Sequence, residues 1–115
     1  MVHFTYVAIP IIILQPEGAI VHTGTEHVDM NCSAIGHSTI MYHWQKYNTN
    51  SSEWTSLPTD QQIDTSKMST YRINMLAKSD DGIYRCVATN IDGSGYSKNV
   101  TITVYGKFVI YHPNL

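Results

Sequence analysis

Cys32 and Cys86 are the residues of this 115-residue chain best suited to covalent chemistry. Each stands in a run where apolar and polar residues alternate, Val28–Cys32 and Tyr84–Ala88, on the apolar set of positions. A zinc site needs cysteines roughly two to four residues apart together with matching histidines, and the chain has neither. The pattern therefore favours a disulfide between strands that face each other across two sheets, with two buried free thiols as the alternative. A disulfide would place the chain in an oxidising compartment.

The other residue types used in catalysis do not form a recognisable site. The six histidines are scattered, at positions 3, 22, 27, 37, 43 and 112, and none belongs to a His-Glu-x-x-His run. No Gly-x-Ser-x-Gly elbow for a nucleophilic serine is present. Gly93-Ser94-Gly95 is too short for a phosphate-binding loop, and Asp80-Asp81 suits a tight turn better than acid–base work. We therefore expect no enzymatic activity, catalytic residue, metal or cofactor.

Length and composition exclude several classes of protein. A chain of 115 residues is about one domain, and its 43% hydrophobic content is too high for a disordered chain. Seven basic and nine acidic residues give a formal net charge of −2, and the basic residues do not cluster. Because nucleic-acid binding depends on clustered basic residues, we expect no nucleic-acid partner.

The N-terminal apolar run, Phe4–Leu14, contains Pro10 and is too short for a membrane-spanning helix, which needs roughly 20 residues. Its length suits the core of a signal peptide, but it lacks a basic residue before the core and a small-residue cleavage site after it. Its branched residues between prolines favour a β-strand, with a cleaved signal peptide as the alternative. We expect no direct membrane insertion by this chain.

Short alternating runs separated by turn residues dominate the sequence, and helical periodicity is absent. Side chains two apart in a strand share a face, so each run has one buried and one solvated face. Regularly spaced strands of this kind predict an antiparallel sandwich or barrel. The predicted strands are 10–14, 19–23, 27–34, 40–47, 53–57, 62–66, 70–76, 82–90 and 96–105.

These residues resemble the immunoglobulin superfamily, and within it the I-set domains. Trp44 follows Cys32 by 12 residues, as the strand-C tryptophan of that family does, and Asp80-x-Gly82-x-Tyr84-x-Cys86 is similar to its E–F corner. The resemblance covers about residues 10–105. It implies an all-β, immunoglobulin-like antiparallel β-sandwich of Greek-key topology with one inter-sheet disulfide. It also implies that the Tyr84 phenol hydrogen-bonds to the corner backbone.

Two features depart from a compact I-set domain. The cysteines are 54 residues apart, which lies between the I-set and variable-domain spacings. Glu53–Leu57 predicts a C′ strand, a feature of variable domains. Both I-set and V-set assignments therefore stay open.

The two ends of the chain resemble each other. Val2–Val7 is similar to Val100–Tyr105 at an offset of 98 residues, which is about one immunoglobulin domain, and Ile12–Pro16 is similar to Val109–Pro113. The hypothesis is that residues 1–9 end a preceding domain or form a linker. Residues 10–106 would then be the domain, and residues 107–115 a linker or the start of the next. Chance similarity between β-rich segments is the alternative.

Three Asn-x-Ser/Thr triplets are candidate glycosylation sites, at Asn50, Asn99 and Asn31. Asn50 lies in a predicted polar turn, and Asn99 should point outward because Val100 points inward. Asn31 abuts the cysteine of the predicted disulfide and is the least accessible. The alternative is that such triplets occur by chance in a chain rich in Asn, Ser and Thr.

A partner protein would bind the sheet of strands C, C′, F and G, in homophilic or heterophilic contact. With Trp44 and Cys86 pointing inward, their neighbours point outward, Val87 among them, and exposed Tyr and Trp favour protein interfaces. The alternative for Trp54 is packing against the sandwich edge, and for Tyr47 a cap on the sheet. The turn Asn90–Gly95 is a second candidate. The predicted partner-binding residues are His43, Gln45, Tyr47, Trp54, Arg85 and Thr89.

The resemblance implies a non-enzymatic protein-recognition module, one domain of the extracellular part of a cell-adhesion molecule or cell-surface receptor. It would be membrane-attached only through parts absent from this sequence. Two alternatives remain, a structural spacer in a tandem array and an ectodomain piece of a receptor kinase. Fold alone does not choose among them.

Overall fold

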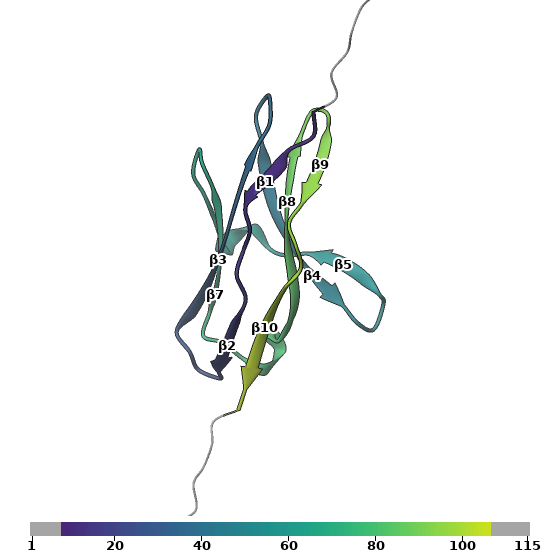
Figure 1. Cartoon of the computed structure of the whole chain (residues 1–115). Coiled ribbons are helices and arrows are strands. Elements are labelled where there is room, and N and C mark those ends of the chain that lie inside the picture. The colour runs from purple at the N-terminus through teal and green to yellow at the C-terminus, as the bar shows by residue number, and fades with distance from the viewer. Residues whose placement is uncertain (1–7, 107–115) are drawn as a thin grey trace, which may run out of the picture.

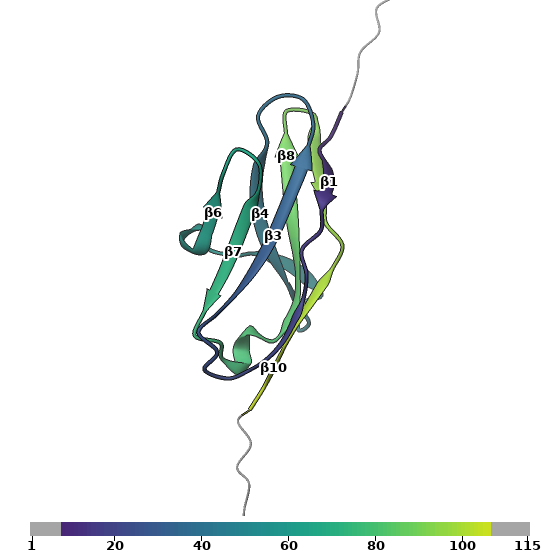
Figure 2. The same ribbon diagram turned by 60° about the vertical axis from the view of Figure 1, so that its left-hand side comes forward.

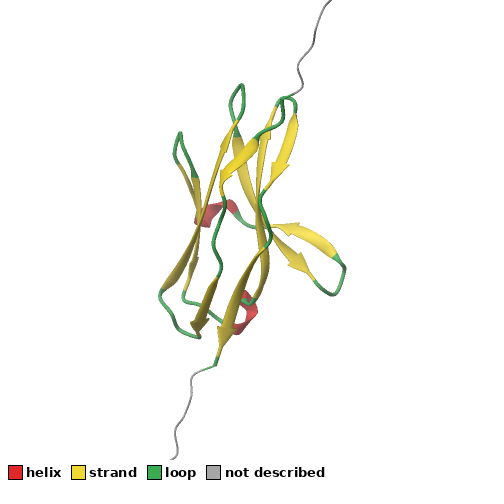
Figure 3. Ribbon diagram, viewed as in Figure 1, coloured by secondary structure: helices red, strands yellow, loops and turns green. Residues whose placement is uncertain are grey.

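The computed structural model describes residues 8–106, and these fold into two packed β-sheets (Figures 1 and 3). One sheet has the order β1 (Ile11–Leu14), β3 (His27–Ile35), β7 (Ser69–Asn74), β6 (Gln62–Asp64). The other has the order β2 (Ala19–His22), β10 (Val100–Tyr105), β8 (Gly82–Asn90), β4 (Met41–Asn48), β5 (Glu53–Ser56), with β9 (Gly93–Tyr96) paired to β8. Two short 3₁₀ helices, Thr59–Gln61 and Lys78–Asp80, complete the regular structure of this part of the chain. The prediction of an all-β, immunoglobulin-like sandwich is confirmed.

The predicted disulfide joins the two sheets at the centre of the core. Cys32 on β3 and Cys86 on β8 are bonded with their Cα atoms 6.4 Å apart, and both are fully buried. Trp44 on β4 is also fully buried, and its indole N–H donates to the Ser69 hydroxyl at 2.9 Å. The Tyr71 ring lies 6.2 Å from the Trp44 ring. The tryptophan thus fills the space between the sheets and has a partner for its polar atom.

The turn before β8 is the corner that the resemblance implied. The Tyr84 hydroxyl donates to the Asp80 carbonyl, and the Asp80 carboxylate accepts the Ala77 N–H at 2.8 Å. Burial raises the pKa of Tyr84, and the nearby Asp80 adds to the effect. Gly82 has a φ of +154°, a backbone conformation that residues with a side chain rarely adopt, so a larger residue there would be strained. Asp80, Gly82 and Tyr84 therefore hold the start of β8 in place.

The first strand crosses from one sheet to the other between β1 and β2. β1 pairs with β3, whereas β2 runs parallel to β10, an exception to the antiparallel pairing (Figure 2 shows β1 beside β3). The crossing brings Gly18 against the backbone of β10, where a Cβ would lie 2.2 Å from the carbonyl oxygen of Thr101. Only glycine permits this close approach of two backbones.

Most predicted strands differ from the observed ones by one or two residues, but the last one was wrong. The predicted strand 96–105 is interrupted, because β9 ends at Tyr96 and β10 begins at Val100. Between them the Ser97 hydroxyl accepts the Cys86 N–H at 2.8 Å, which replaces a ladder hydrogen bond. The predicted turn 90–95 is correspondingly shorter, since Asn90 pairs directly with Gly93. The predicted C′ strand is present as β5.

The described chain enters and leaves at opposite ends of the sandwich (Figure 1). Ala8 lies at the end where β8 turns into β9, since its N–H donates to Asp92 at 3.2 Å. The predicted segments 1–7 and 107–115 lie outside the described residues. No helix within residues 8–106 is long and apolar enough to cross a membrane.

Candidate functional site

The outward side chains of β5, β4, β8 and β9 form one continuous surface, here called the β4–β8 outer face. Strand register fixes its rows: His43 stands opposite Val87 and then Tyr96, while Gln45 stands opposite Arg85. All six predicted partner-binding residues belong to it. Its members are Met41, His43, Gln45, Tyr47, Trp54, Ser56, Ile83, Arg85, Val87, Thr89, Ser94 and Tyr96.

Arg85 is held between two aromatic rings at the centre of this face. Its Cζ atom lies 4.1 Å from the centroid of the Trp54 ring and 4.5 Å from that of Tyr96. Its Nε donates to the Gln45 side-chain oxygen at 2.7 Å. Each cation–π contact contributes about 0.5–1 kcal/mol at exposed sites. Three neighbours thus fix a side chain that would otherwise be mobile.

Gln45 links Arg85 to His43. The amide nitrogen of Gln45 lies 3.5 Å from Nε2 of His43, and Gln45 uses its oxygen for Arg85. Burial lowers the pKa of His43, and the positive charge of Arg85 lowers it further. His43 is therefore neutral at pH 7, with Nε2 oriented to accept from Gln45.

Trp54, on the edge strand β5, lies over the outer face on the same side of the sheet as Arg85. Its ring meets the Tyr47 ring edge-on, with centroids 5.3 Å apart and planes at 70°, and it also covers Arg85. Trp54 and Tyr47 are directly opposite in the β4–β5 pairing, which forces both onto the same face. Both rings are half-buried and add aromatic surface to the β4–β8 outer face.

Sequence reasoning missed two large exposed members of the face, Tyr96 at 54% and Met41 at 72% exposure. Val87 points outward, as predicted, but is only 1% exposed. It stands between His43 and Tyr96 in the register, and they cover it. A continuous strand 96–105 would have turned Tyr96 inward with Val100. If Asn90 is paired with Gly93 at the hairpin and the pairs are then counted along the two strands, Tyr96 falls opposite Val87. Counting from the hairpin would therefore have assigned Tyr96 to the outer face.

The hairpin between β8 and β9, the second predicted candidate, holds the entering chain. The Asn90 amide donates to the carbonyls of Ala8 at 2.9 Å and His37 at 3.0 Å. Asp92 accepts the Ala8 N–H and lies 3.2 Å from Nε2 of His37. Ile91 at the tip is 82% exposed. The polar residues of this turn therefore have structural partners already.

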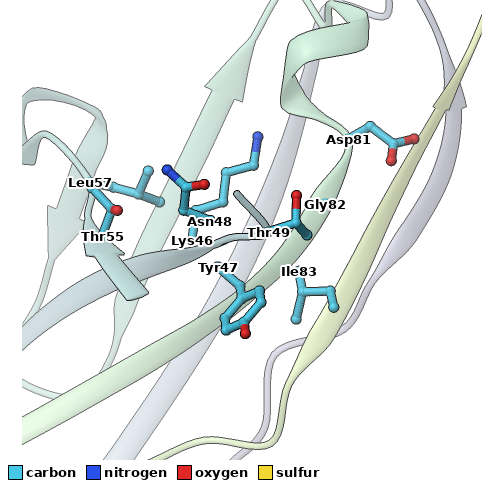
Figure 4. Close-up of a pocket in the computed structure, with 9 residues that line it drawn as sticks. All are labelled: Lys46, Tyr47, Asn48, Thr49, Thr55, Leu57, Asp81, Gly82 and Ile83. Carbon is cyan, nitrogen blue, oxygen red and sulfur yellow. The ribbon is translucent and has the colours of Figure 1, made fainter. Parts of the chain in front are cut away.

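A cavity of about 510 Å³ lies where the β4–β5 hairpin diverges from β8 (Figure 4). Its two charged groups are already engaged: the Lys46 amine donates to the Ser79 carbonyl, and the Asp81 carboxylate accepts the Val104 N–H at 2.8 Å. That hydrogen bond is the main cause of the lowered pKa of Asp81. The lining residues are Lys46, Tyr47, Asn48, Thr49, Thr55, Leu57, Asp81, Gly82 and Ile83.

The three candidate glycosylation residues are all exposed. Asn50 is in the turn between β4 and β5, and Asn99 is in the break before β10. Asn31 lies on the outer side of β3, where its side-chain oxygen accepts a hydrogen bond from the Thr70 hydroxyl at 2.7 Å.

Among residues 8–106, no three His, Cys, Asp or Glu side chains lie close enough together to hold a metal ion.

Known proteins support the same architecture. A family model for the immunoglobulin domain matches residues 9–90. The titin M10–obscurin-like 1 Ig complex has a chain that superposes with a TM-score of 0.72 at 17% identity, covering 89% of this chain and 99% of that one. The N-terminal Ig1-2 module of the Drosophila receptor protein tyrosine phosphatase DLAR gives 0.71 at 24%, covering 86% and 50%. The tandem Ig repeats of Dlar give 0.70 at 26%, covering 90% and 51%. This chain thus spans about half of each Dlar fragment, and no curated protein sequence matches it.

Proposed function

Because this chain belongs to the immunoglobulin domain family, we propose that it is a non-enzymatic protein-recognition module. We place it in the extracellular part of a cell-adhesion molecule or cell-surface receptor. One observation carries the proposal: Arg85, Trp54 and Tyr96 are stacked at the centre of a sheet face that is accessible in the described chain. Trp, Tyr and Arg are the residues most enriched among binding hot spots.

The accessible members of the face surround this stack. Met41 and Tyr96 are largely exposed, and Thr89 and Ser94 share a hydrogen bond at 2.7 Å beside them. Rigid aromatic side chains lose little conformational entropy on binding, which suits them to contact a partner. We propose His43, Gln45, Tyr47, Trp54, Arg85 and Thr89, together with Met41 and Tyr96, as the partner-binding residues.

An array of purified extracellular proteins probed with the tetramerised chain tests this proposal. Replacing His43, Tyr47 and Arg85 together with Ala should abolish binding to any protein that the wild type binds. The matched control replaces three exposed residues of the opposite sheet, His27, Asn74 and Ile63, and should bind normally. A β4–β8 triple variant that folds and binds as well as wild type would reject this face.

An extracellular location is supported by the Cys32–Cys86 disulfide, which fits an oxidising compartment. We propose Asn50 and Asn99 as glycosylated residues, since both are exposed. Asn31 remains the third candidate. Glycosidase treatment of protein secreted from mammalian cells should lower its mass, and Asn50→Gln and Asn99→Gln should each remove one glycan. A mass that glycosidase leaves unchanged would contradict the assignment.

A second candidate function is a spacer in a tandem array. The observation that favours it is the entry and exit of the chain at opposite ends of the sandwich, which suits head-to-tail connection (Figure 1). Under this proposal residues 1–9 and 107–115 are linkers or pieces of neighbouring domains, and 10–106 is the domain. A chain of residues 8–106 should then melt no lower than the full chain, whereas a large loss of stability would argue against the boundaries. An ectodomain piece of a receptor kinase fits the same geometry.

A further inference from the structure

We infer that the partner binds the β4–β8 outer face through a carboxylate, an Asp or Glu side chain of a protein, that pairs with the guanidinium of Arg85. The inference rests on the proposed function and adds the chemistry of the partner. It comes from the state of Arg85, which has three side-chain neighbours and whose positive charge has no counter-ion on its face among residues 8–106.

The guanidinium has unused donors. Its two flat faces lie against Trp54 and Tyr96, and Nε donates to Gln45. Nη1 and Nη2 make no hydrogen bond to any residue between 8 and 106. Neither of these atoms is fully buried. They are therefore accessible. A carboxylate is the group whose two oxygens match a guanidinium donor pair.

The face does not supply a carboxylate of its own. Its outward positions on β5, β4, β8 and β9 hold no Asp or Glu in the described structure. Glu53, on β5, stands next to Trp54 and so points to the other side of the sheet. Arg85 is therefore the uncompensated charge of this surface, and a partner that fits it must carry the opposite sign.

A second copy of this chain is a poor occupant. A two-fold contact centred on this face would bring one Arg85 toward the other, with no acidic residue of the face to separate them. In such a contact the rings of Trp54, Tyr96 and Tyr47 would exclude water around the guanidinium, which would strengthen both this repulsion and the attraction to a carboxylate. The fitting partner presents an acidic side chain within an apolar patch.

The test uses a display library of disulfide-constrained peptides, selected in parallel on the full chain and on Arg85→Gln. Binders that need Arg85 should share an Asp or Glu at one fixed position, flanked by apolar residues. Changing that acid to its amide should lower affinity for the wild-type chain by at least about tenfold. The same change should have no effect on Arg85→Gln, because the two groups act as a pair. Arg72→Gln, on the opposite sheet, is the matched control and should leave binding unchanged.

Each other outcome overturns the inference. The carboxylate is rejected as the group that pairs with Arg85 if the selection yields no Arg85-dependent peptide. It is also rejected if the selected peptides bind equally well after their acid is replaced by its amide. If Tyr96→Ala and Met41→Ala weaken the selected peptides while Arg85→Gln does not, the face is correct and the carboxylate is wrong. If none of the three has an effect, the proposed function fails as well. Sialyllactose bound by wild type but not by Arg85→Gln, with no acidic peptide selected, would assign the site to a carboxylated sugar instead.

Discussion

The two sheets each present one arginine on their outer side, and only one of the two is paired with a carboxylate. Arg72 on β7 stands directly opposite Asp29 on β3, and its Nε and Nη2 donate to the two carboxylate oxygens at 2.8 and 2.9 Å. The hydrogen bonds from Arg72 lower the pKa of Asp29. Arg85 stands opposite Gln45, a neutral residue, and is flanked by aromatic rings.

The difference separates two uses of the same residue type. A cross-strand carboxylate makes Arg72 part of a self-sufficient surface, and a partner would have to break that pair to use it. Gln45 fixes the position of Arg85 without cancelling its charge, and the rings keep its donor edge accessible. A charged side chain that is ordered but uncompensated is a better candidate for binding than one that is already paired.

Removing the disulfide should have the largest effect, because both faces depend on one core. Replacing Cys32 and Cys86 together with Ala should lower the free energy of unfolding by about 4 kcal/mol on the chain-entropy model for a loop of this length. Urea unfolding followed by tryptophan fluorescence measures the loss, since Trp44 is buried beside the disulfide. Ser97→Ala, which removes the acceptor of the Cys86 N–H and the donor to the Lys98 carbonyl but leaves the disulfide, is the comparison and should cost about 1–3 kcal/mol. A double cysteine variant as stable as wild type would contradict this account of the core.

The core could be predicted from sequence because its signals are local and specific. Cys32, Trp44 and Cys86 lie on alternating runs whose inward set is unambiguous, and all three are buried. The pairing of Arg72 with Asp29 could not be predicted without the register of β3 against β7, which depends on contacts distant in sequence.

The candidate site was predicted only in part, because it too depends on strand register. His43, Gln45 and Arg85 follow from strand alternation, so their common face could be predicted. Tyr96 was missed because it was assigned to the strand 96–105, whereas the break at Ser97 separates it from Val100 and reverses the side that it faces. The sandwich of rings around Arg85 joins three strands, and no spacing along the chain encodes it.

Giving Arg85 a carboxylate of its own should make the two faces alike. In Gln45→Glu the new carboxylate replaces the oxygen that Arg85 already contacts at 2.7 Å, so the pair should form without rearrangement. Affinity for an Arg85-dependent acidic peptide should fall by at least about tenfold, since the donors are then neutralised. Surface plasmon resonance measures the affinity. Gln45→Met keeps the volume without adding charge and should lose much less; equal losses in the two variants would mean that position, not charge, governs binding.

Removing Arg72 should affect stability and leave binding unchanged. Arg72→Gln leaves Asp29 unpaired on an exposed surface, so the free energy of unfolding should fall slightly at pH 7. Because Arg72 lowers the folded pKa of Asp29 below its usual 3.8, this contribution is fully present above that value. It is lost as the pH falls through the folded pKa. The difference in unfolding free energy between wild type and variant should therefore be smaller at pH 2 than at pH 7. A difference that is as large at pH 2 as at pH 7 would contradict the ion pair as its cause.

The smallest expected effect is on the titration of His43, which reports the charge of Arg85 directly. Burial and the Arg85 charge hold the folded pKa of His43 below 6.5, so folding loses free energy as the pH falls from about that value through the folded pKa. Arg85→Gln removes the second cause and should move the pKa of His43 part of the way back up. Gln45→Glu should raise it further by adding a negative charge beside the ring. NMR titration of the His43 ring protons measures both changes, with Arg72→Gln as the control that leaves the His43 curve in place. A His43 pKa equal in wild type and Arg85→Gln would mean that the guanidinium charge is already cancelled on this face, and the contrast between the two arginines would fail.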